Sequence, residues 1–198
     1  MAIKFQYNKT FIQDLNRQLA IRLKALPILQ NKETALRKEV KQKRVELKLV
    51  DEQKQELMTK VEKHKILWSE FPNILFVKGT KLKYYKVIGV KIPKLDEVEF
   101  QMADFGWWNF PAWFPMGIKL LKEALTLEVK EEVLLEQISL LDAARKKTTQ
   151  KVNLYEKVQI PEMEEAILKI KRFLEDKENI SKAGQKIMKK RQLEREAA

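Results

Sequence analysis

The chain has 198 residues and no cysteine, and its 40 basic and 28 acidic side chains give a formal net charge of +12 at pH 7. The absence of cysteine excludes disulfides, thiolate metal sites and cysteine nucleophiles. Charged residues make up 34% of the chain and glycine occurs only 5 times, a composition typical of long solvated helices. We therefore expect an elongated helical protein.

One heptad frame runs without interruption from Ile12 to Val61 and predicts the seam of a left-handed coiled coil. Eleven of its fifteen a and d positions are apolar. A helix of this extent would be roughly 90 Å long at about 1.5 Å rise per residue. The fifteen positions are Ile12, Leu15, Leu19, Arg22, Leu26, Leu29, Glu33, Leu36, Val40, Lys43, Leu47, Val50, Lys54, Leu57 and Val61.

Pro27 lies inside this helical stretch. Its ring removes one backbone hydrogen bond and crowds the carbonyl of Leu23, which predicts a kink. A short interhelix loop at Leu26–Pro27 is the alternative, although the unbroken heptad frame favours the kink.

The pattern changes after Phe71-Pro72, where β-branched and aromatic residues begin to dominate and Gly or Pro separates the runs. The stretch from Ile74 to Met102 predicts two or three short strands, most simply a hairpin with an edge strand. Phe105–Pro115 holds three of the four Trp residues and is expected to form a compact aromatic loop. This loop is either a partner-binding patch or interfacial anchor, or a small core that caps the coiled coil.

The helical period returns near Met116 and runs almost to the end of the chain. Pro161 lies where the a/d frame shifts by one residue, and we expect it to cause the shift. The last stretch, Lys177–Ala198, is polar and needs a partner to be a firm helix. The first frame holds Leu134, Ile138, Leu141, Arg145, Thr148, Val152 and Tyr155, and the second holds Ile160, Met163, Ile167, Ile170 and Leu174.

Two long helices with one apolar stripe each can bury their seams only by folding back on one another. The predicted fold is therefore mainly α, a long antiparallel two-helix coiled coil, or helical hairpin. A short β-hairpin and the aromatic loop form a head at the end opposite the termini. We expect an N-terminal coiled-coil helix over residues 1–70, the head over 71–115 and a C-terminal coiled-coil helix over 116–198.

The residues offer little catalytic chemistry. The one histidine, His64, lies in a charged run and is best explained as part of a solvated helix face. None of the five glycines opens a phosphate-binding loop of the Gly-x4-Gly-Lys-Ser/Thr type. We therefore expect no catalytic residue, no cofactor and no metal.

The charge is unevenly distributed, with +8 over residues 1–50, +5 over 146–198 and −5 over 93–145. A basic end suits nucleic acid, anionic lipid or an acidic protein socket. Acidic residues interleave with the basic ones and the aromatic residues lie elsewhere, which disfavours nucleic acid. No secretion signal and no run of about 20 apolar residues is present, so we expect a cytoplasmic protein without direct membrane insertion.

Several strings, in their order along the chain, resemble the D subunit, the central stalk of V/A-type ATPases. Asn8-Lys9-Thr10 and Asn31–Arg37 are similar to the opening of that family and to its Lys-rich helix. Ile88–Pro93 resembles the family's Gly-Val-Lys-Val-Pro string, and Lys147–Glu156 followed by Ile160-Pro161 resembles Thr-Arg-Arg-Val-Asn-Ala-Leu-Glu followed by Ile-Pro. The resemblance covers essentially the whole chain.

The chain departs from the family pattern at several places. Gln150 and Lys151 stand where paired arginines are common, and Leu154-Tyr155 replaces Ala-Leu. Pro27 and the Trp-rich loop look like additions, to which no family role can be transferred.

The resemblance implies a rotor that contributes no catalysis. Its paired terminal helices would lie inside a ring of alternating catalytic and regulatory subunits, and its head would face a funnel-shaped coupling subunit on the membrane side. The small F subunit would bind the side of the stalk. Rotation would couple ATP hydrolysis or synthesis to H⁺ or Na⁺ translocation, with the chain in the soluble sector, peripheral to the membrane.

Candidate partner contacts follow from these motifs, from the aromatic loop, which helix packing does not require, and from the basic tip. The alternative function is a basic coiled-coil adaptor or a nucleic-acid-binding protein. The candidate contacts are Lys147, Thr148, Lys151, Val152 and Asn153 in the C-terminal helix, Gly89, Val90 and Ile92 in the hairpin, Trp107, Trp108 and Trp113 in the aromatic loop, and Lys189, Lys190 and Arg191 near the C-terminus.

Overall fold

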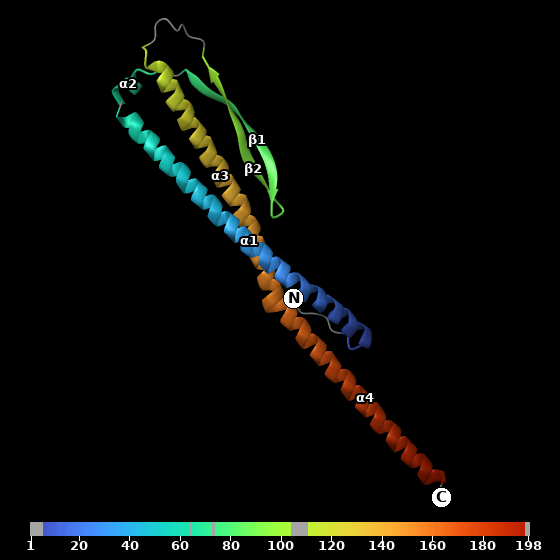
Figure 1. Cartoon of the computed structure of the whole chain (residues 1–198). Helices are drawn as coiled ribbons and strands as arrows, with labels where there is room; N and C mark the ends of the chain where they lie inside the picture. The colour runs from blue at the N-terminus through green and yellow to red at the C-terminus, as the bar shows by residue number, and fades with distance from the viewer. Residues whose placement is uncertain (1–5, 64, 73, 104–110, 197–198) are drawn as a thin grey trace. The chain divides into compact units, whose positions relative to one another are not determined.

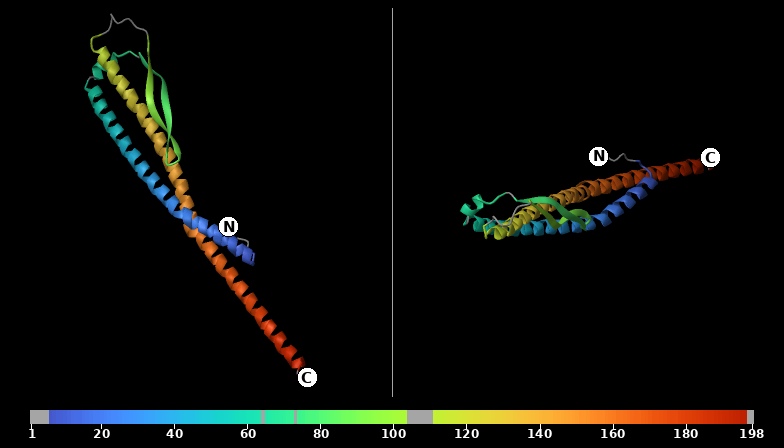
Figure 2. Two further views of the ribbon diagram at one scale, coloured as in Figure 1. Left: turned by 45° about the vertical axis from the view of Figure 1, so that its right-hand side comes forward. Right: turned by 90° about the horizontal axis from the view of Figure 1, so that it is seen from above.

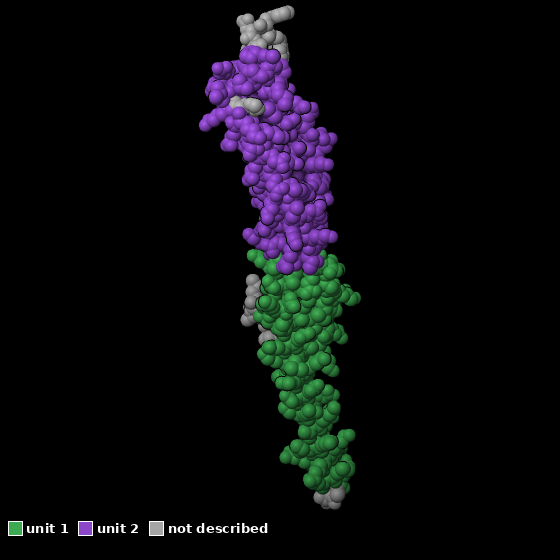
Figure 3. Space-filling view, turned by 60° about the vertical axis from the view of Figure 1, so that its left-hand side comes forward, with its two compact units in different colours: residues 1–31, 148–198 green, residues 32–147 purple. Residues whose placement is uncertain are grey.

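The computed structural model describes residues 6–63, 65–72, 74–103 and 111–196, and these are mainly helical (Figure 1). Two compact units divide the chain: unit 1 consists of Met1–Asn31 and Thr148–Ala198, and unit 2 of Lys32–Lys147 (Figure 3). The elements in chain order are α1 (Lys9–Glu62), α2 (Lys65–Ser69), β1 (Leu75–Val87), β2 (Val90–Met102), α3 (Phe114–Leu154), the π-helical turn η2 (Tyr155–Gln159) and α4 (Ile160–Glu196).

Helix α1 confirms the predicted heptad seam. All fifteen seam positions between Ile12 and Val61 are buried or half-buried, and none is exposed. The helix continues through Pro27, whose side chain is exposed. An interhelix loop at this position is therefore wrong, because one missing hydrogen bond is tolerated within a seam that is otherwise intact. The kink itself stays a prediction.

In unit 1, the first part of α1 packs antiparallel against α4. Asn8 Oδ1 accepts a hydrogen bond of 2.6 Å from the backbone N–H of Phe11, which satisfies one of the free donors at the start of α1. Tyr7 stacks on Phe173 with ring centroids 4.5 Å apart. The buried cluster between the two helices consists of Leu15, Met163, Ala166, Ile167 and Ile170.

The predicted shift of the seam by one residue is present as the π-helical turn η2. The backbone N–H of Ile160 bonds to the carbonyl of Tyr155, five residues back, so one residue more than in an α-turn is accommodated. Pro161 follows at the second position of α4, inside a helix that continues from η2 without a break. The π turn is thus the local form that the shift takes, directly before the proline.

The end of α4 has no packing partner among the described residues. Every side chain from Glu175 to Glu196 is exposed, and the segment makes i,i+4 contacts such as that of Lys182 with Glu178 at 3.2 Å. These pairs stabilise a solvated helix only weakly. That Lys177–Ala198 needs a partner to be a firm helix stays a prediction.

In unit 2, the remainder of α1 packs antiparallel against α3, and the β-hairpin lies alongside α3 (Figures 1 and 2). Leu36 of α1 meets Leu141 of α3, and further along Lys54 meets Glu131. The fully buried Ile92 of β2 joins Leu36, Val40 and Leu141 in one cluster. The predicted mainly α fold, a helical hairpin with a two-stranded antiparallel β-hairpin, is confirmed.

The hairpin has two strands of 13 residues each, longer than the short strands predicted. The register runs from Val87↔Val90 at the turn to Leu75↔Met102 at the open end, with irregularities between Val77 and Gly79 and between Lys81 and Leu82. The sequence suggested shorter strands because bulges interrupt the alternation that marks a regular strand.

Candidate interaction surfaces

The three candidate residues of the hairpin differ in how exposed they are. Gly89 is exposed with φ of +82°, whereas Val90 is half-buried. Ile92 is fully buried against Leu36 and Leu141. In this structure Ile92 therefore holds the hairpin to the helices, and of the three residues Gly89 alone is exposed.

Ile88 is a residue of the turn that the site prediction left out. Its φ of +51° lies in the left-handed region, which is unfavourable for a β-branched side chain. Positive φ at both Ile88 and Gly89 is the arrangement of a type I′ turn, which usually takes Asn-Gly. Ile88 packs against the cluster of Leu36, Val40, Ile92 and Leu141, so its burial offsets the backbone strain. In the sequence, the Ile-Gly pair between two β-rich runs is the feature from which this turn could have been predicted.

The candidate motif in α3 presents two different faces. Thr148 is buried and Val152 half-buried, both in unit 1, as expected of seam positions. Lys151 and Asn153 of the same unit are exposed. Lys147, in unit 2, is exposed as well. Only the three exposed residues are available to a partner without unpacking the seam.

The aromatic candidates are only partly covered by the structure, because Trp107 and Trp108 lie outside the described residues. Trp113 is half-buried and packs against Trp68, Phe71 and Phe114 with ring centroids 4.9–6.0 Å apart. Such tilted and edge-on contacts are those of a small aromatic core. For Trp113 the structure therefore favours the capping role over an exposed patch.

Gly117 makes this aromatic core possible. A Cβ atom added at Gly117 would lie 2.9 Å from the ring of Phe71 and 3.1 Å from that of Trp113. Beside it a cavity of about 190 Å³ is lined by Leu67, Trp68, Trp113, Met116, Gly117 and Leu120. Glycine at this point lets α3 approach the aromatic rings closely.

The basic candidates near the C-terminus, Lys189, Lys190 and Arg191, are exposed on the unpacked end of α4. Lys190 makes a single long contact to Glu194, 3.9 Å from Nζ to Oε1. These charges are therefore free to meet another surface.

Ion pairs between elements mark the register of unit 2. Lys54 of α1 donates to Glu131 of α3 at 2.8 Å, and this bond raises the pKa of Lys54. In the hairpin, the bond from Lys81 lowers the pKa of Glu99 across the strands. These contacts are largely solvated, so they contribute more to the choice of register than to the stability of the fold.

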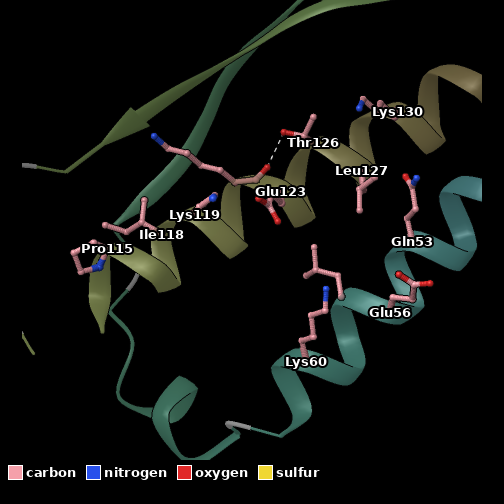
Figure 4. Close-up of a pocket in the computed structure, with 12 residues that line it drawn as sticks. Gln53, Glu56, Lys60, Pro115, Ile118, Lys119, Glu123, Thr126, Leu127 and Lys130 are labelled. Atoms are coloured by element: carbon pink, nitrogen blue, oxygen red, sulfur yellow. Dashed lines mark hydrogen bonds between the residues drawn. The ribbon is translucent and has the colours of Figure 1, made fainter. Parts of the chain in front are cut away.

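A cleft of about 620 Å³ lies between α1 and α3 in unit 2 (Figure 4). Lys60 of α1 and Glu123 of α3 extend into the space between these helices without forming an ion pair there. Thr126 instead donates to the carbonyl of Lys122 within α3, at 2.7 Å. The helices are therefore less closely packed here than at the Leu36–Leu141 cluster.

Gln137 is a second residue that the site prediction missed. Only 4% of it is exposed, and its Nε2 donates to the carbonyl of Pro93, which fixes β2 on α3. Its Oε1 is buried without a partner among the described residues. No sequence pattern marks Gln137, because its role depends on where the hairpin returns along the helix.

The described residues contain no group of three or more His, Cys, Asp or Glu side chains that could hold a metal ion. None of the described helices is long and apolar enough to cross a membrane.

Comparison with known proteins adds an independent finding. The family model for the D subunit of ATP synthase matches residues 12–190. The V-type ATP synthase D subunit of Borreliella burgdorferi is 30% identical over 189 residues, which cover 94% of this chain and 94% of that protein. The V-type ATP synthase D subunit of Chlamydia pneumoniae is 31% identical over 111 residues, 56% of this chain and 53% of its own length.

Proposed function

The chain belongs to the ATP synthase D-subunit family, and we propose that it is the central rotor stalk of a V/A-type rotary ATPase. In this role it couples ATP hydrolysis or synthesis in the catalytic ring to the translocation of protons or sodium ions. It contributes no catalytic residue, because the coupling is mechanical. The observation that carries the proposal is the family match over residues 12–190, from the first turns of α1 into the bare end of α4.

The packing within each unit supports a mechanical role. A stalk that transmits torque must keep its helices in register, and interlocking seam residues resist sliding. In unit 1, Arg22 Nε donates to Gln159 Oε1 at 2.7 Å across the seam. In unit 2, the Lys54–Glu131 bond has the same effect. Each polar contact has a favourable distance at one register only, so sliding by a turn would break it.

The proposed partners follow from the exposed surfaces. The basic end of α4, including Lys189, Lys190 and Arg191, faces the catalytic and regulatory subunits of the ring. Weak, screened contacts there allow turning. The end with the aromatic core faces the membrane-side coupling subunit, and the small F subunit binds the side of the stalk through residues such as Lys151 and Asn153. The assembled chain lies in the cytoplasmic sector of the complex.

A deletion in the assembled ATPase tests the rotor proposal. Removing Lys186–Ala198 should weaken ATP-driven ion pumping more than ATP hydrolysis, because the unpacked end of α4 would no longer be held by the ring. The matched control keeps the length and replaces Lys189, Lys190 and Arg191 by Gln, which separates loss of charge from loss of the helix end. Both activities are measured on the same vesicles.

The alternatives give different results in this experiment. Pumping and hydrolysis that both stay intact after the deletion would point to a coiled-coil adaptor. Purification of the chain with RNA, with binding that falls steeply as salt rises, would point to a nucleic-acid-binding protein.

A further inference from the structure

The outer edge of β1 is left open by the described part of the chain. The sheet has two strands only, and β1 pairs with β2 alone. The outer edge of β2 receives one bond from α3, where Gln137 donates to the carbonyl of Pro93. Among the described residues, no other element donates a hydrogen bond to the backbone of β1 or accepts one from it.

The register identifies the backbone groups that point outward from this edge. Pro93 has no amide hydrogen and its carbonyl is taken by Gln137, so Tyr84↔Pro93 is a non-hydrogen-bonded pair of the ladder. The N–H and C=O of Tyr84 therefore point away from β2. Because such pairs alternate, the same groups of Leu82 and Lys86 also point outward.

The side chains along β1 are suited to covering by another segment. Phe76 is 48% exposed and Tyr84 is 56% exposed, large values for aromatic residues in a strand. Lys83, Tyr84 and Tyr85 also line a cleft of about 880 Å³, together with residues of β2, α1 and α3. Exposed apolar surface is thus available on the strand, and the cleft lies between the hairpin and the helices.

The charge of β1 determines which segment can add to it. The strand carries Lys78, Lys81, Lys83 and Lys86 and no acidic residue. Lys81 and Lys83 are paired with acidic residues of β2, whereas Lys78 and Lys86 have no ion pair within the described residues. Lysines at an edge oppose pairing with a second copy of the same strand, since like charges opposite each other are destabilising.

We propose that the outer edge of β1 docks an extended, acidic segment of a partner protein, which adds to the hairpin as a third strand. Main-chain bonds to the outward groups of Leu82, Tyr84 and Lys86 provide the attachment. Carboxylates opposite the free lysines provide the selectivity, and β-branched or aromatic residues cover Phe76 and Tyr84. The proposal does not depend on the rotor function, because it concerns a recognition surface of the hairpin itself.

A synthetic peptide tests the proposal on the full chain. The probe is the eight-residue peptide Glu-Glu-Val-Val-Glu-Glu-Val-Val, which carries both glutamate and valine on each face because side chains alternate along a strand, and the control peptide has lysine in place of glutamate. Amide hydrogen exchange, read residue by residue by NMR, should slow at Leu82, Tyr84 and Lys86 with the acidic peptide. The amides of the β1–β2 ladder, such as those of Val87 and Tyr85, should change little.

Two variants of one residue separate backbone from charge. Lys86→Thr removes the charge but keeps the outward N–H, whereas Lys86→Pro removes both and leaves the ladder with β2 intact. The Pro variant should bind the acidic peptide about fivefold more weakly than the Thr variant, as expected for one lost main-chain hydrogen bond. Unchanged exchange at Val87 verifies that the hairpin is still formed.

Several results would overturn the proposal. If the lysine peptide binds as tightly as the acidic one, the proposed selectivity for acidic segments is wrong. If the two Lys86 variants bind the acidic peptide equally, the partner does not add as a third strand. Absence of slowed exchange in the unmodified chain at millimolar peptide would reject the site outright, even if a variant failed to fold. If the unmodified chain self-associates and the Pro variant does not, the edge binds a second copy of the chain instead.

Discussion

The two units of the chain reach full burial of core side chains in different ways. In unit 1, the buried cluster joins residues of α1 and α4, and its fully buried positions are Ala166 and Ile170. In unit 2, a third element covers the helix pair, and Leu36, Leu141 and Ile92 all have 0% exposure.

The difference shows how a two-helix coiled coil can be completed. A pair of helices encloses its seam from two sides only, so a small residue such as Ala166 must let the backbones approach. Where the hairpin lies on the helices, larger side chains can be enclosed on a third side. We therefore expect unit 2 to depend on contacts far apart in sequence, and unit 1 on the fit of two helices.

The largest expected effect comes from removing the residue that joins three elements. Ile92→Ala should lower the free energy of unfolding by about 4 kcal/mol, because the cavity lies between α1, α3 and β2 and cannot collapse easily. Ile170→Ala, also at 0% exposure, should cost about 3 kcal/mol, because two helices can close on the space. Urea unfolding of both variants measures the difference. A larger loss for Ile170→Ala would contradict the comparison.

Gly117→Ala tests the aromatic end of unit 2 by overpacking. The added methyl group would lie 2.9 Å from the ring of Phe71, so the aromatic rings must shift. We expect a loss of about 2 kcal/mol together with a changed tryptophan fluorescence spectrum. Unchanged fluorescence with unchanged stability would show that the rings have room to move.

Gly184→Ala is the matched change on the bare end of α4, where an added Cβ meets no atom within 4 Å. Alanine favours the helix by about 1 kcal/mol over glycine, so the helicity of residues 175–196 should rise. Circular dichroism of the full chain measures this gain. A loss of helicity would mean that the segment is not a solvated helix in solution.

The smallest effect concerns Asp142, whose pKa lies below the ordinary value of an aspartate. The main cause is the hydrogen bond of 2.8 Å that Arg145 donates to its carboxylate. A carboxyl group with a lowered pKa in the folded state stabilises the fold above its ordinary pKa. That contribution is lost as the pH falls from about 4 through the folded-state pKa. The free energy of unfolding should thus fall less with acid in Asp142→Asn than in the unmodified chain. Equal acid sensitivity of the two would contradict it.

Much of the helical fold could be predicted because periodicity is a local property. The seam of α1, from Ile12 to Val61, followed from apolar spacing alone, and so did the one-residue shift before Ile160. The loop alternative at Pro27 was wrong because the packing of the seam outweighs one lost hydrogen bond. Patterns of this kind need no knowledge of the rest of the chain.

The surfaces could be predicted less well because they depend on where distant elements meet. Ile92 was proposed as a partner contact but is fully buried, since the hairpin returns along the helices. Gln137 was not singled out, although it bonds to Pro93, 44 residues away in sequence. Thr148 is likewise a seam residue by burial. The contact roles of Lys151, Asn153, Gly89 and the basic end of α4 stay predictions.

The π turn at Tyr155–Gln159 implies that this part of unit 1 tolerates a change of chain length. A π turn holds one residue more than an α-turn, and this extra residue lets α4 keep its apolar face toward α1. Removing Val158 would convert the widened turn into an ordinary one while Met163, Ile167 and Ile170 still faced Leu15. Single-residue insertions and deletions could therefore accumulate at this point without scrambling the pairing beyond it.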